Sequence, residues 1–389
     1  MKLNFVFDNE NIPNGIEEKL QKIYIKDYDT FSNLTDIRMP KVLKFFDHTK
    51  EVLSESSKGI YAIELNPDNP DHFNIKNIKC IIELYVSDLA RKKIKNGSIK
   101  LIFFLNFETY NTNKLLQISD LLSENFEDFT LYTRSTLLCS RDKFRHICYD
   151  EILILREKEF NVGIRKNYPY ITLNDKKLFN ILAYGRELLD FRAAAIQILF
   201  NLNAHKNSLI TVSKDTGIEK NFTKNTSNKI NQLVEKTNFQ DDTFNDAWGV
   251  PLPFTEIFKN TKISFILAPY FDFYEFDYPF LNEKIIRAAF HKQPFLILSQ
   301  QGTLKAFRSK GYKTFHPYIN ENYDNIENND ERFFEVIKQF LYLNSLSDKK
   351  LSEFFKDVSP VLTHNFNIFY TVIKNEFDFL MKKQNDCIL

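Results

Sequence analysis

The chain has 389 residues, 43% of them hydrophobic, which is enough for about two domains with cores of ordinary size. Its 52 basic and 51 acidic residues give a net charge of +1, which argues against a strongly basic nucleic-acid-binding protein. The four cysteines include no CxxC pair and no cluster at metal-binding spacing, so we expect reduced thiols.

The N-terminus and the hydropathy pattern bear on localisation. The chain turns polar and acidic from Asp8 onward, unlike a signal peptide, and it contains no run of about 18 apolar residues. We therefore expect a cytoplasmic protein without a membrane partner.

In the first half of the chain, short apolar runs alternate with amphipathic stretches, a pattern typical of α/β units. The run Ile99–Asn106 is mostly apolar, as a strand buried on both faces should be. The stretches 81–95 and 112–124 carry apolar residues at helical spacing. The other expected strands are Leu3–Phe7, Ile60–Leu65, Phe129–Thr133 and Glu151–Leu155.

The pattern restarts after a polar stretch, Arg156–Pro169, which we interpret as a domain boundary. Roughly the last 60 residues are predicted to be helical, with weak breaks near Ser345 and Pro360. Further helices are expected up to Phe200 and over 224–236, 283–291 and 302–309, and the expected strands are Lys177–Ala183, Ser208–Ser213, Lys262–Ala268 and Pro294–Leu298.

These elements predict an α/β protein with two Rossmann-like domains, residues 1–165 and 170–345, a cleft between the domains and a helical tail over 346–389. In open α/β sheets, ligands bind outside the carboxyl ends of the strands. The residues that follow each strand are therefore the first candidates for a site.

The first candidate is the turn Tyr184-Gly185-Arg186, between a predicted strand and the helix after it. Free N–H groups and the helix dipole favour an anion at such a helix start, and Arg186 adds a bidentate donor for diphosphate oxygens. Arg192 follows six residues later and could face the same side only loosely. An ordinary strand–helix turn with solvated arginines is the alternative.

The second candidate is the segment Phe280–Lys284. Asn282 is a plausible N-cap, which places Glu283 and Lys284 in the first helical turn. Glu283 could accept the hydroxyl groups of a ribose, and Lys284 could neutralise a phosphate. The alternative is plain capping with an ion pair between Glu283 and Arg287. A lysine in the first turn opposes the helix dipole, however, and requires another reason.

The third candidate follows the run Pro294–Leu298, where a polar turn leads to Gly302 and Thr303 at a helix start. The chain has only nine glycines, which makes Gly302 more informative than a glycine in an average protein. A simple strand–helix loop is an equally weighted alternative. The acidic, asparagine-rich run Glu321–Glu331 is interpreted as a solvated loop.

In the first half, Glu108 directly follows the most apolar strand and is the candidate general base for an acceptor hydroxyl. A surface glutamate at a strand exit is the alternative, and Asp142 and His146 are weaker candidates. No Walker loop, GxGxxG, GxSxG or HExxH motif is present, and no DxD follows a predicted strand. We therefore expect neither a bound metal nor a cofactor.

Residues 280–332 (FLNEKIIRAAFHKQPFLILSQQGTLKAFRSKGYKTFHPYINENYDNIENNDER) resemble a group of phage and viral glycosyltransferases. The pattern of that group is F-[TS]-E-K, P-F-[IL], Gly-Thr-Leu, G-[FY]-x-T-F and E-x-Y-D. The stretches KKLFNILAYGRELLDFRAAAIQIL and NSLITVS are similar to upstream segments of the same group. The segment is also similar, more distantly, to the donor-binding segment of fucosyltransferase-like GT-B enzymes. Asn282 stands where the group has Thr or Ser.

The resemblance covers about residues 176–340, and 60–160 only weakly. It implies a GT-B enzyme that moves a sugar from a nucleotide-diphosphate sugar to an acceptor hydroxyl, without a metal. Glu283 would hold the donor ribose, Lys284 and Arg186 the diphosphate, and Glu108 would be the base. The other donor-binding positions that we expect are Gly185, Arg192, Ser213, Asn282, Gly302 and Thr303.

Three alternatives concern the partner. The acceptor could be a hydroxymethylated base in double-stranded phage DNA, and the segment Arg91–Lys95 could supply charge toward it, although a solvated helix face also explains that segment. The acceptor could instead be a surface glycan or a protein. The chain could also be a non-catalytic nucleotide- or DNA-binding protein of the same fold. For a viral protein, the expected location is the cytoplasm of the host cell.

Overall fold

A computed structural model describes residues 2–8, 48–65, 78–79, 82–83, 86–105, 112–133, 144–146, 177–182, 190–211, 258, 260–271 and 279–386. These residues form a mixed α/β protein with two parallel sheets. The chain divides into two compact units. The first comprises Met1–Ile152, Glu275–Tyr278 and Val372–Leu389, and the second comprises Leu153–Tyr274 and Pro279–Thr371.

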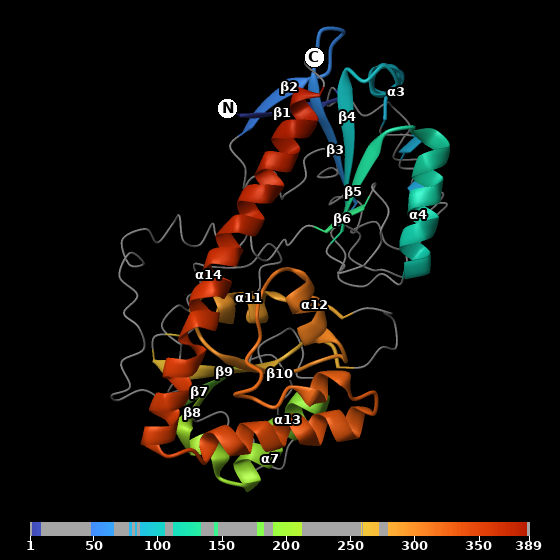
Figure 1. The fold of residues 1–389 in the computed structure, drawn as a ribbon. Coiled ribbons are helices and arrows are strands. Elements are labelled where there is room, and N and C mark those ends of the chain that lie inside the picture. The colour runs from blue at the N-terminus through green and yellow to red at the C-terminus, as the bar shows by residue number, and fades with distance from the viewer. Residues whose placement is uncertain are drawn as a thin grey trace. The chain divides into compact units, whose positions relative to one another are not determined.

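The first unit contains a six-stranded parallel sheet with the order β2-β1-β3-β4-β5-β6 (Figure 1). Its strands are β1 (Leu3–Phe7), β2 (His48–Val52), β3 (Gly59–Leu65), β4 (Ile99–Leu105), β5 (Phe129–Thr133) and β6 (Phe144–His146). The chain leaves β1 for β2 on one side and resumes with β3 on the other side. The strand order therefore reverses between β1 and β3, and this reversal is the topological switch point of the sheet.

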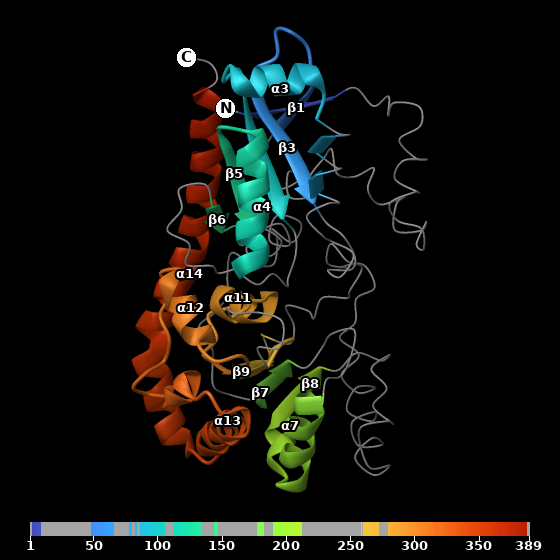
Figure 2. The ribbon, with the colours of Figure 1, turned by 90° about the vertical axis from the view of Figure 1, so that its right-hand side faces the viewer.

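Helices α3 (Asp88–Lys95) and α4 (Thr112–Asn125) cover one face of this sheet (Figure 2). Phe103 of β4 belongs to the hydrophobic core beneath them. Its neighbour Phe104 points to the other face, where it stacks on Tyr132 of β5 with ring centroids 5.0 Å apart. Both faces of β4 are apolar and buried, which explains why its sequence is nearly continuous in hydrophobic residues.

The last turns of α14 (Asp348–Asn385) cover the opposite face of the first sheet. Phe379 meets the ring of Tyr132 edge-on, with centroids 6.2 Å apart. Gln384 accepts a hydrogen bond from the backbone N–H of Asn4 and donates one to the carbonyl of Lys2. These contacts bury the sheet on both faces, as a parallel sheet requires.

The second unit contains a four-stranded parallel sheet with the order β10-β9-β7-β8. Its strands are β7 (Lys177–Leu182), β8 (Ser208–Thr211), β9 (Thr261–Leu267) and β10 (Phe295–Leu298). After β7, the chain adds β8 on one side of it and then β9 and β10 on the other side. The switch point of this sheet therefore lies between β7 and β9.

Helices of the described ranges cover both faces of the second sheet (Figures 1 and 2). Helices α7 (Asp190–Asn201) and α13 (Asn329–Asn344) lie on one face, and α11 (Glu283–Phe290) and α12 (Thr303–Ser309) lie on the other. The connections through α7 and α11 run in opposite directions along the sheet, so right-handed crossovers place these two helices on opposite faces. Two short 3-10 helices are η5 (Ala204–Asn207) and η6 (Asn322–Asn325).

The sequence missed two strands of the first sheet, β2 and β6. Both lie at the edges of the sheet, and neither HTKEV nor FRH has the apolar pattern of a buried strand. The expected strand Glu151–Leu155 and the expected helix over 224–236 lie outside the described residues. The other expected strands and helices are confirmed, with shifts of a few residues at their ends and a later start, at Asp88, for the helix expected from 81.

The two predicted breaks in the C-terminal helices have different outcomes. The break near Ser345 is confirmed, because α13 ends at Asn344 and α14 begins at Asp348. The break near Pro360 is wrong, because α14 continues through it. Proline lacks a backbone N–H and weakens a helix interior. Here the buried side chains of Val358 and Leu362 hold the turn on both sides of the proline. No helix in the described ranges is both long and apolar enough to cross a bilayer.

Candidate functional site

The predicted donor-binding residues all belong to segments that follow strands of the second sheet. Because the four strands are parallel, their carboxyl ends lie at one edge. The described members of the set are Arg192, Asn282, Glu283, Lys284, Gly302 and Thr303, whereas Gly185, Arg186 and Ser213 lie outside the described residues. The same holds for Glu108, Asp142 and the side chain of His146 in the first half of the chain.

Asn282 caps the start of α11, as the sequence predicted. Its Oδ1 accepts hydrogen bonds from the backbone N–H groups of Lys284, at 3.0 Å, and Ile285, at 3.4 Å. The amide nitrogen Nδ2 is buried and has no hydrogen-bond partner among the described residues. The residue is 1% exposed. A buried donor without an acceptor costs free energy, so Nδ2 is suited to an oxygen atom of a ligand.

Lys284 lies in the first turn of the same helix and is 4% exposed. Its ammonium group is withdrawn from water close to the positive end of the helix dipole, and both conditions favour an anion nearby. The helix begins at Glu283, of which the structure describes the backbone only. The predicted ribose contact of Glu283 and its alternative pairing with Arg287 therefore stay predictions.

The segment before α11 is joined to the segment after β10. The backbone N–H of Phe280 donates to Gln300 Oε1 at 3.0 Å. Gly302 lies against Pro279, whose Cγ would be 3.4 Å from a Cβ atom added to the glycine. The structure thus brings the second and third predicted segments together at the carboxyl edge of the sheet.

Arg192 reaches from α7 to the exit of β9, beside the switch point. Its Nε donates to the carbonyl of Ala268 at 3.0 Å, and the residue is 2% exposed. Its guanidinium carbon lies 5.9 Å from the ring centroid of Phe191. In this position Arg192 links α7 to the end of a neighbouring strand.

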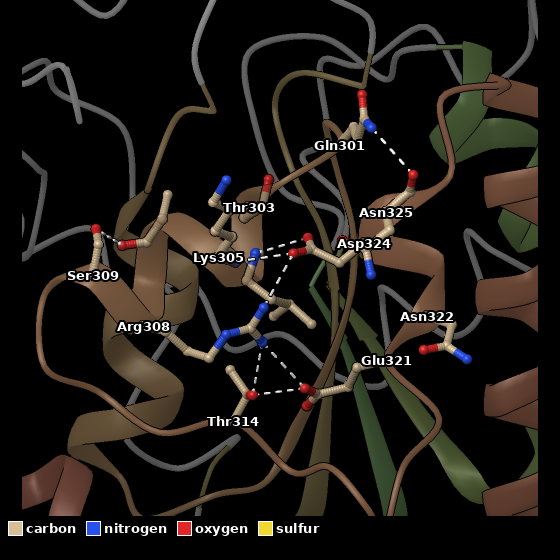
Figure 3. Close-up of polar contacts among 12 residues, drawn as sticks. Gln301, Thr303, Lys305, Arg308, Ser309, Thr314, Glu321, Asn322, Asp324 and Asn325 are labelled. Carbon is tan, nitrogen blue, oxygen red and sulfur yellow. Dashed lines mark hydrogen bonds and ion pairs between the residues drawn. The ribbon is translucent and has the colours of Figure 1, made fainter. Parts of the chain in front are cut away.

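The start of α12 is filled by a carboxylate of the chain itself (Figure 3). Gly302 is the N-cap, with a φ of 77°, and it has no side chain to offer. Instead, the two carboxylate oxygens of Asp324 accept hydrogen bonds from the N–H groups of Leu304, at 2.8 Å, and Lys305, at 2.9 Å. The carbonyl of Asp324 accepts a third, from Gly302, at 2.8 Å.

The hydrogen-bond donors of Thr303 are also bonded within the chain. Its N–H and its Oγ1 both donate to the carbonyl of Gln300, at 3.4 and 2.7 Å, and the residue is fully buried. The donors that a phosphate would need at Gly302 and Thr303 are therefore already occupied.

A second buried carboxylate, Glu321, shares an arginine with Asp324 (Figure 3). Arg308 Nη1 lies 3.4 Å from Glu321 Oε2, and its Nη2 lies 3.7 Å from Asp324 Oδ2. Glu321 also accepts hydrogen bonds from Thr314 Oγ1, at 2.6 Å, and from the N–H of Phe315. Burial raises the pKa of both carboxyl groups above their ordinary values, and the hydrogen bonds and Arg308 offset only part of this rise.

The interpretation of the run Glu321–Glu331 as a solvated loop is wrong for its first part. Glu321 is 8% exposed and Asp324 only 3%. The acidic residues of this part are buried because they serve the neighbouring segment, above all the start of α12. The end of the run begins α13, where the side chain of Asn328 accepts from the N–H of Glu331.

Arg332 is a central residue that no pattern in the sequence indicated. It is 2% exposed, and its guanidinium donates to the carbonyl oxygens of Phe271 and Ser299, at 2.8 and 3.1 Å. It also donates to the carbonyls of Ile326 and Glu327, at 2.8 and 3.2 Å. One side chain therefore ties the segment after β9 to the segment after β10.

The basic segment Arg91–Lys95 is partly used by the fold of the first unit. Arg91 donates two hydrogen bonds to backbone carbonyls, and Lys93 is buried and donates to the carbonyl of Glu55 at 2.8 Å. Lys92 and Lys95 are exposed. The charge that this segment offers to a nucleic acid is thus smaller than its composition indicates.

Among the described residues, no group of three or more His, Cys, Asp or Glu is placed to hold a metal ion. No protein-family model matches the chain, and no curated protein matches it in sequence. Among solved structures, the chain is similar to a crystal structure of the glycotransferase of kitacinnamycin. The sequence identity is 8%, the TM-score is 0.36, and the similarity covers 98% of each chain.

Proposed function

We propose that the chain is a cytoplasmic glycosyltransferase of the GT-B type, with a nucleotide-diphosphate sugar as donor and a hydroxyl group as acceptor. The observation that carries the proposal is the start of α11. A buried amide donor on Asn282 and a buried ammonium group on Lys284 occur together at the positive end of a helix. A diphosphate supplies the oxygen atoms and the negative charge that this combination favours. The proposal requires no bound metal.

The place of this helix start in the fold also supports the proposal. It belongs to the connection that follows β9, one of the two strands beside the switch point. The other strand, β7, ends at Leu182, and Gly185 and Arg186 follow three and four residues later. We propose that Arg186 and Lys284 hold the diphosphate from two sides.

In the reaction that we propose, negative charge develops on the diphosphate as the sugar is transferred to the acceptor hydroxyl. The bond between the sugar carbon and the diphosphate oxygen breaks, and the acceptor oxygen forms a new bond to that carbon. The nucleoside diphosphate leaves with the electron pair, stabilised by Arg186, Lys284 and the dipole of α11. Glu108 takes the proton of the acceptor hydroxyl, and Glu283 holds the ribose.

Contacts within the chain reduce the set of residues that can bind the donor. The N–H groups of Gly302 and Thr303 and the hydroxyl of Thr303 are bonded within the chain, and Arg192 is bonded to Ala268. We assign these three residues to the support of the site and not to the donor itself. The donor site that we propose therefore consists of Gly185, Arg186, Asn282, Glu283 and Lys284, with Ser213 after β8 as a further member.

Thermal unfolding with a panel of UDP- and GDP-sugars tests the function. At least one of them should raise the melting temperature, and hydrolysis of that compound should be measurable without an acceptor. Replacement Glu283→Ala should abolish most of the effect, whereas Glu331→Ala, in the first turn of α13, should not. If no nucleotide sugar raises the melting temperature, the function is wrong. Binding without hydrolysis or transfer would favour the non-catalytic alternative.

The acceptor is a separate part of the proposal. A hydroxymethylated base in phage DNA and a glycan or protein hydroxyl are the two classes that the sequence left open. Mass spectrometry of nucleosides from DNA made with and without the protein distinguishes them. An unchanged nucleoside profile would remove the DNA acceptor and leave the donor site unaffected.

A further inference from the structure

Asp8 connects three elements of the first unit at the carboxyl end of β1. Its Oδ2 accepts hydrogen bonds from Tyr61 Oη of β3, at 2.5 Å, and from the backbone N–H of Ser87, at 3.1 Å. Its Oδ1 accepts one from Ser87 Oγ. Ser87 is the N-cap of α3, and its Oγ in turn accepts from the N–H of Ala90.

This carboxylate lies at the topological switch point of the first sheet. Asp8 directly follows β1 and is bonded to Tyr61 of β3, the two strands between which the order reverses. Tyr61 is the cross-strand partner of Val6, and both belong to the core beneath α3 and α4. Open parallel sheets bind ligands in the crevice at this point.

Asp8 retains the capacity to bind a ligand there. A carboxylate has about four acceptor positions, two on each oxygen. The described residues fill both positions on Oδ2 and one on Oδ1. Asp8 is partly exposed, whereas Tyr61 is 4% exposed and held by the core. These contacts fix the orientation of the carboxylate, and among the described residues one acceptor position, on Oδ1, has no donor.

We propose that Asp8 binds a hydroxyl group of the acceptor and orients it, with Tyr61 and Ser87 as positioning residues behind it. The inference rests on the proposed function, because a glycosyltransferase must bind an acceptor hydroxyl as well as its donor. It adds an acceptor-side residue that is distinct from the base candidate Glu108. The chemistry recognised is a hydroxyl group, and a hydroxymethyl group presents one both on hexose rings and on modified bases.

The experiment uses the full chain and two small probes that carry a hydroxymethyl group, methyl β-D-glucoside and 5-hydroxymethyl-2′-deoxycytidine. Binding is measured by saturation-transfer NMR, with UDP and GDP titrated separately as donor-side probes. The variant is Asp8→Asn, which keeps the size of the side chain. The matched control is Asp88→Asn, because Asp88 is the exposed first residue of α3.

The native chain should bind one of the two hydroxymethyl probes, and which one it binds identifies the source of the group. Asp8→Asn should weaken that binding about tenfold, and Tyr61→Phe about threefold, while Asp88→Asn changes it less than about twofold. UDP and GDP should bind all variants alike, which a general loss of structure would not allow. Should Asp8→Asn not fold, Asp8→Glu takes its place, with the carboxylate displaced by one methylene and the same expectation.

Equal binding of the probe to the native chain and the Asp8 variant would overturn the proposal, as would the absence of binding of both probes to the native chain. Failure of the proposed function is a different result, in which neither UDP, GDP nor any of their sugars binds.

Discussion

Two helices of the second unit begin at the same edge of the same sheet and differ in what meets their first turn. Helix α11 is capped by its own Asn282, has a lysine in the first turn, and leaves the buried Nδ2 of Asn282 without a described partner. Helix α12 begins at Gly302, which has no side chain, and its N–H groups donate to Asp324. That carboxylate comes from 20 residues further along the chain.

The difference shows that a strand, a glycine and a helix start predict a place for an anion but not its source. At α12 the anion is internal, and the site is closed. At α11 the first turn holds Lys284 beside Glu283, and we propose that the lysine serves an external anion. The central claim is therefore that α11 binds the donor and that α12 supports it.

The largest expected effect concerns Arg332, which joins the segment after β9 to the segment after β10. Replacement Arg332→Met leaves the carbonyls of Phe271, Ser299, Ile326 and Glu327 without their charged donor. We expect a loss of about 3–5 kcal/mol in the free energy of unfolding, measured in urea. The control Lys338→Met, on the exposed side of α13, should cost less than about 0.5 kcal/mol. A loss below about 1 kcal/mol for Arg332→Met would contradict the role of this side chain.

Asp324→Ala should destabilise the start of α12 and leave the start of α11 unchanged. The variant removes the acceptor of Leu304 and Lys305, and we expect a loss of about 1–3 kcal/mol in the free energy of unfolding. The dissociation constants of UDP and GDP, measured by calorimetry, should change less than about twofold. A folded Asp324 variant that binds the nucleotides about tenfold more weakly would place the donor at α12 instead.

A pair of N-cap replacements tests whether Asn282 contributes to nucleotide binding at the start of α11. Asn282 and Asn328 cap α11 and α13 in the same way, each through its side-chain oxygen. Asn282→Ala and Asn328→Ala should each cost about 1 kcal/mol of stability. Only Asn282→Ala should also weaken nucleotide binding, by about threefold or more, because only its Nδ2 is available at the proposed site. Equal nucleotide affinities for the two variants would refute the assignment of Nδ2.

The smallest expected effect is a pH dependence of stability near α12. Burial raises the pKa of Glu321 above its ordinary value of 4.5. The folded chain therefore binds this proton more tightly than the unfolded chain does, so its uptake adds stability as the pH falls toward 4.5, and its loss removes stability as the pH rises. In urea unfolding, the native chain should gain stability relative to Glu321→Gln between pH 7 and 5. If the difference in the free energy of unfolding between the two chains stays constant or changes in the other direction, burial does not raise the pKa of Glu321.

The sequence predicted the strands and helices of both sheets largely because burial on both faces leaves an apolar pattern. Ile99–Leu105 is the clearest case. The cap at Asn282 was also predictable, because capping depends on neighbours in the sequence. The buried roles of Asp324 and Arg332 were not, since they join segments 20 to 61 residues apart and their local sequence reads as polar surface. The signal available for Asp324 was indirect, namely a helix start at Gly302 without a cap of its own.

The most direct test of the central claim is the affinity of the chain for UDP and GDP after Lys284→Met, which keeps the length of the side chain and removes its charge. We expect the better of the two nucleotides to bind about tenfold more weakly to the folded variant, because the buried ammonium group at the proposed diphosphate site has been removed. An unchanged dissociation constant in the folded variant would contradict the assignment of the donor diphosphate to the start of α11.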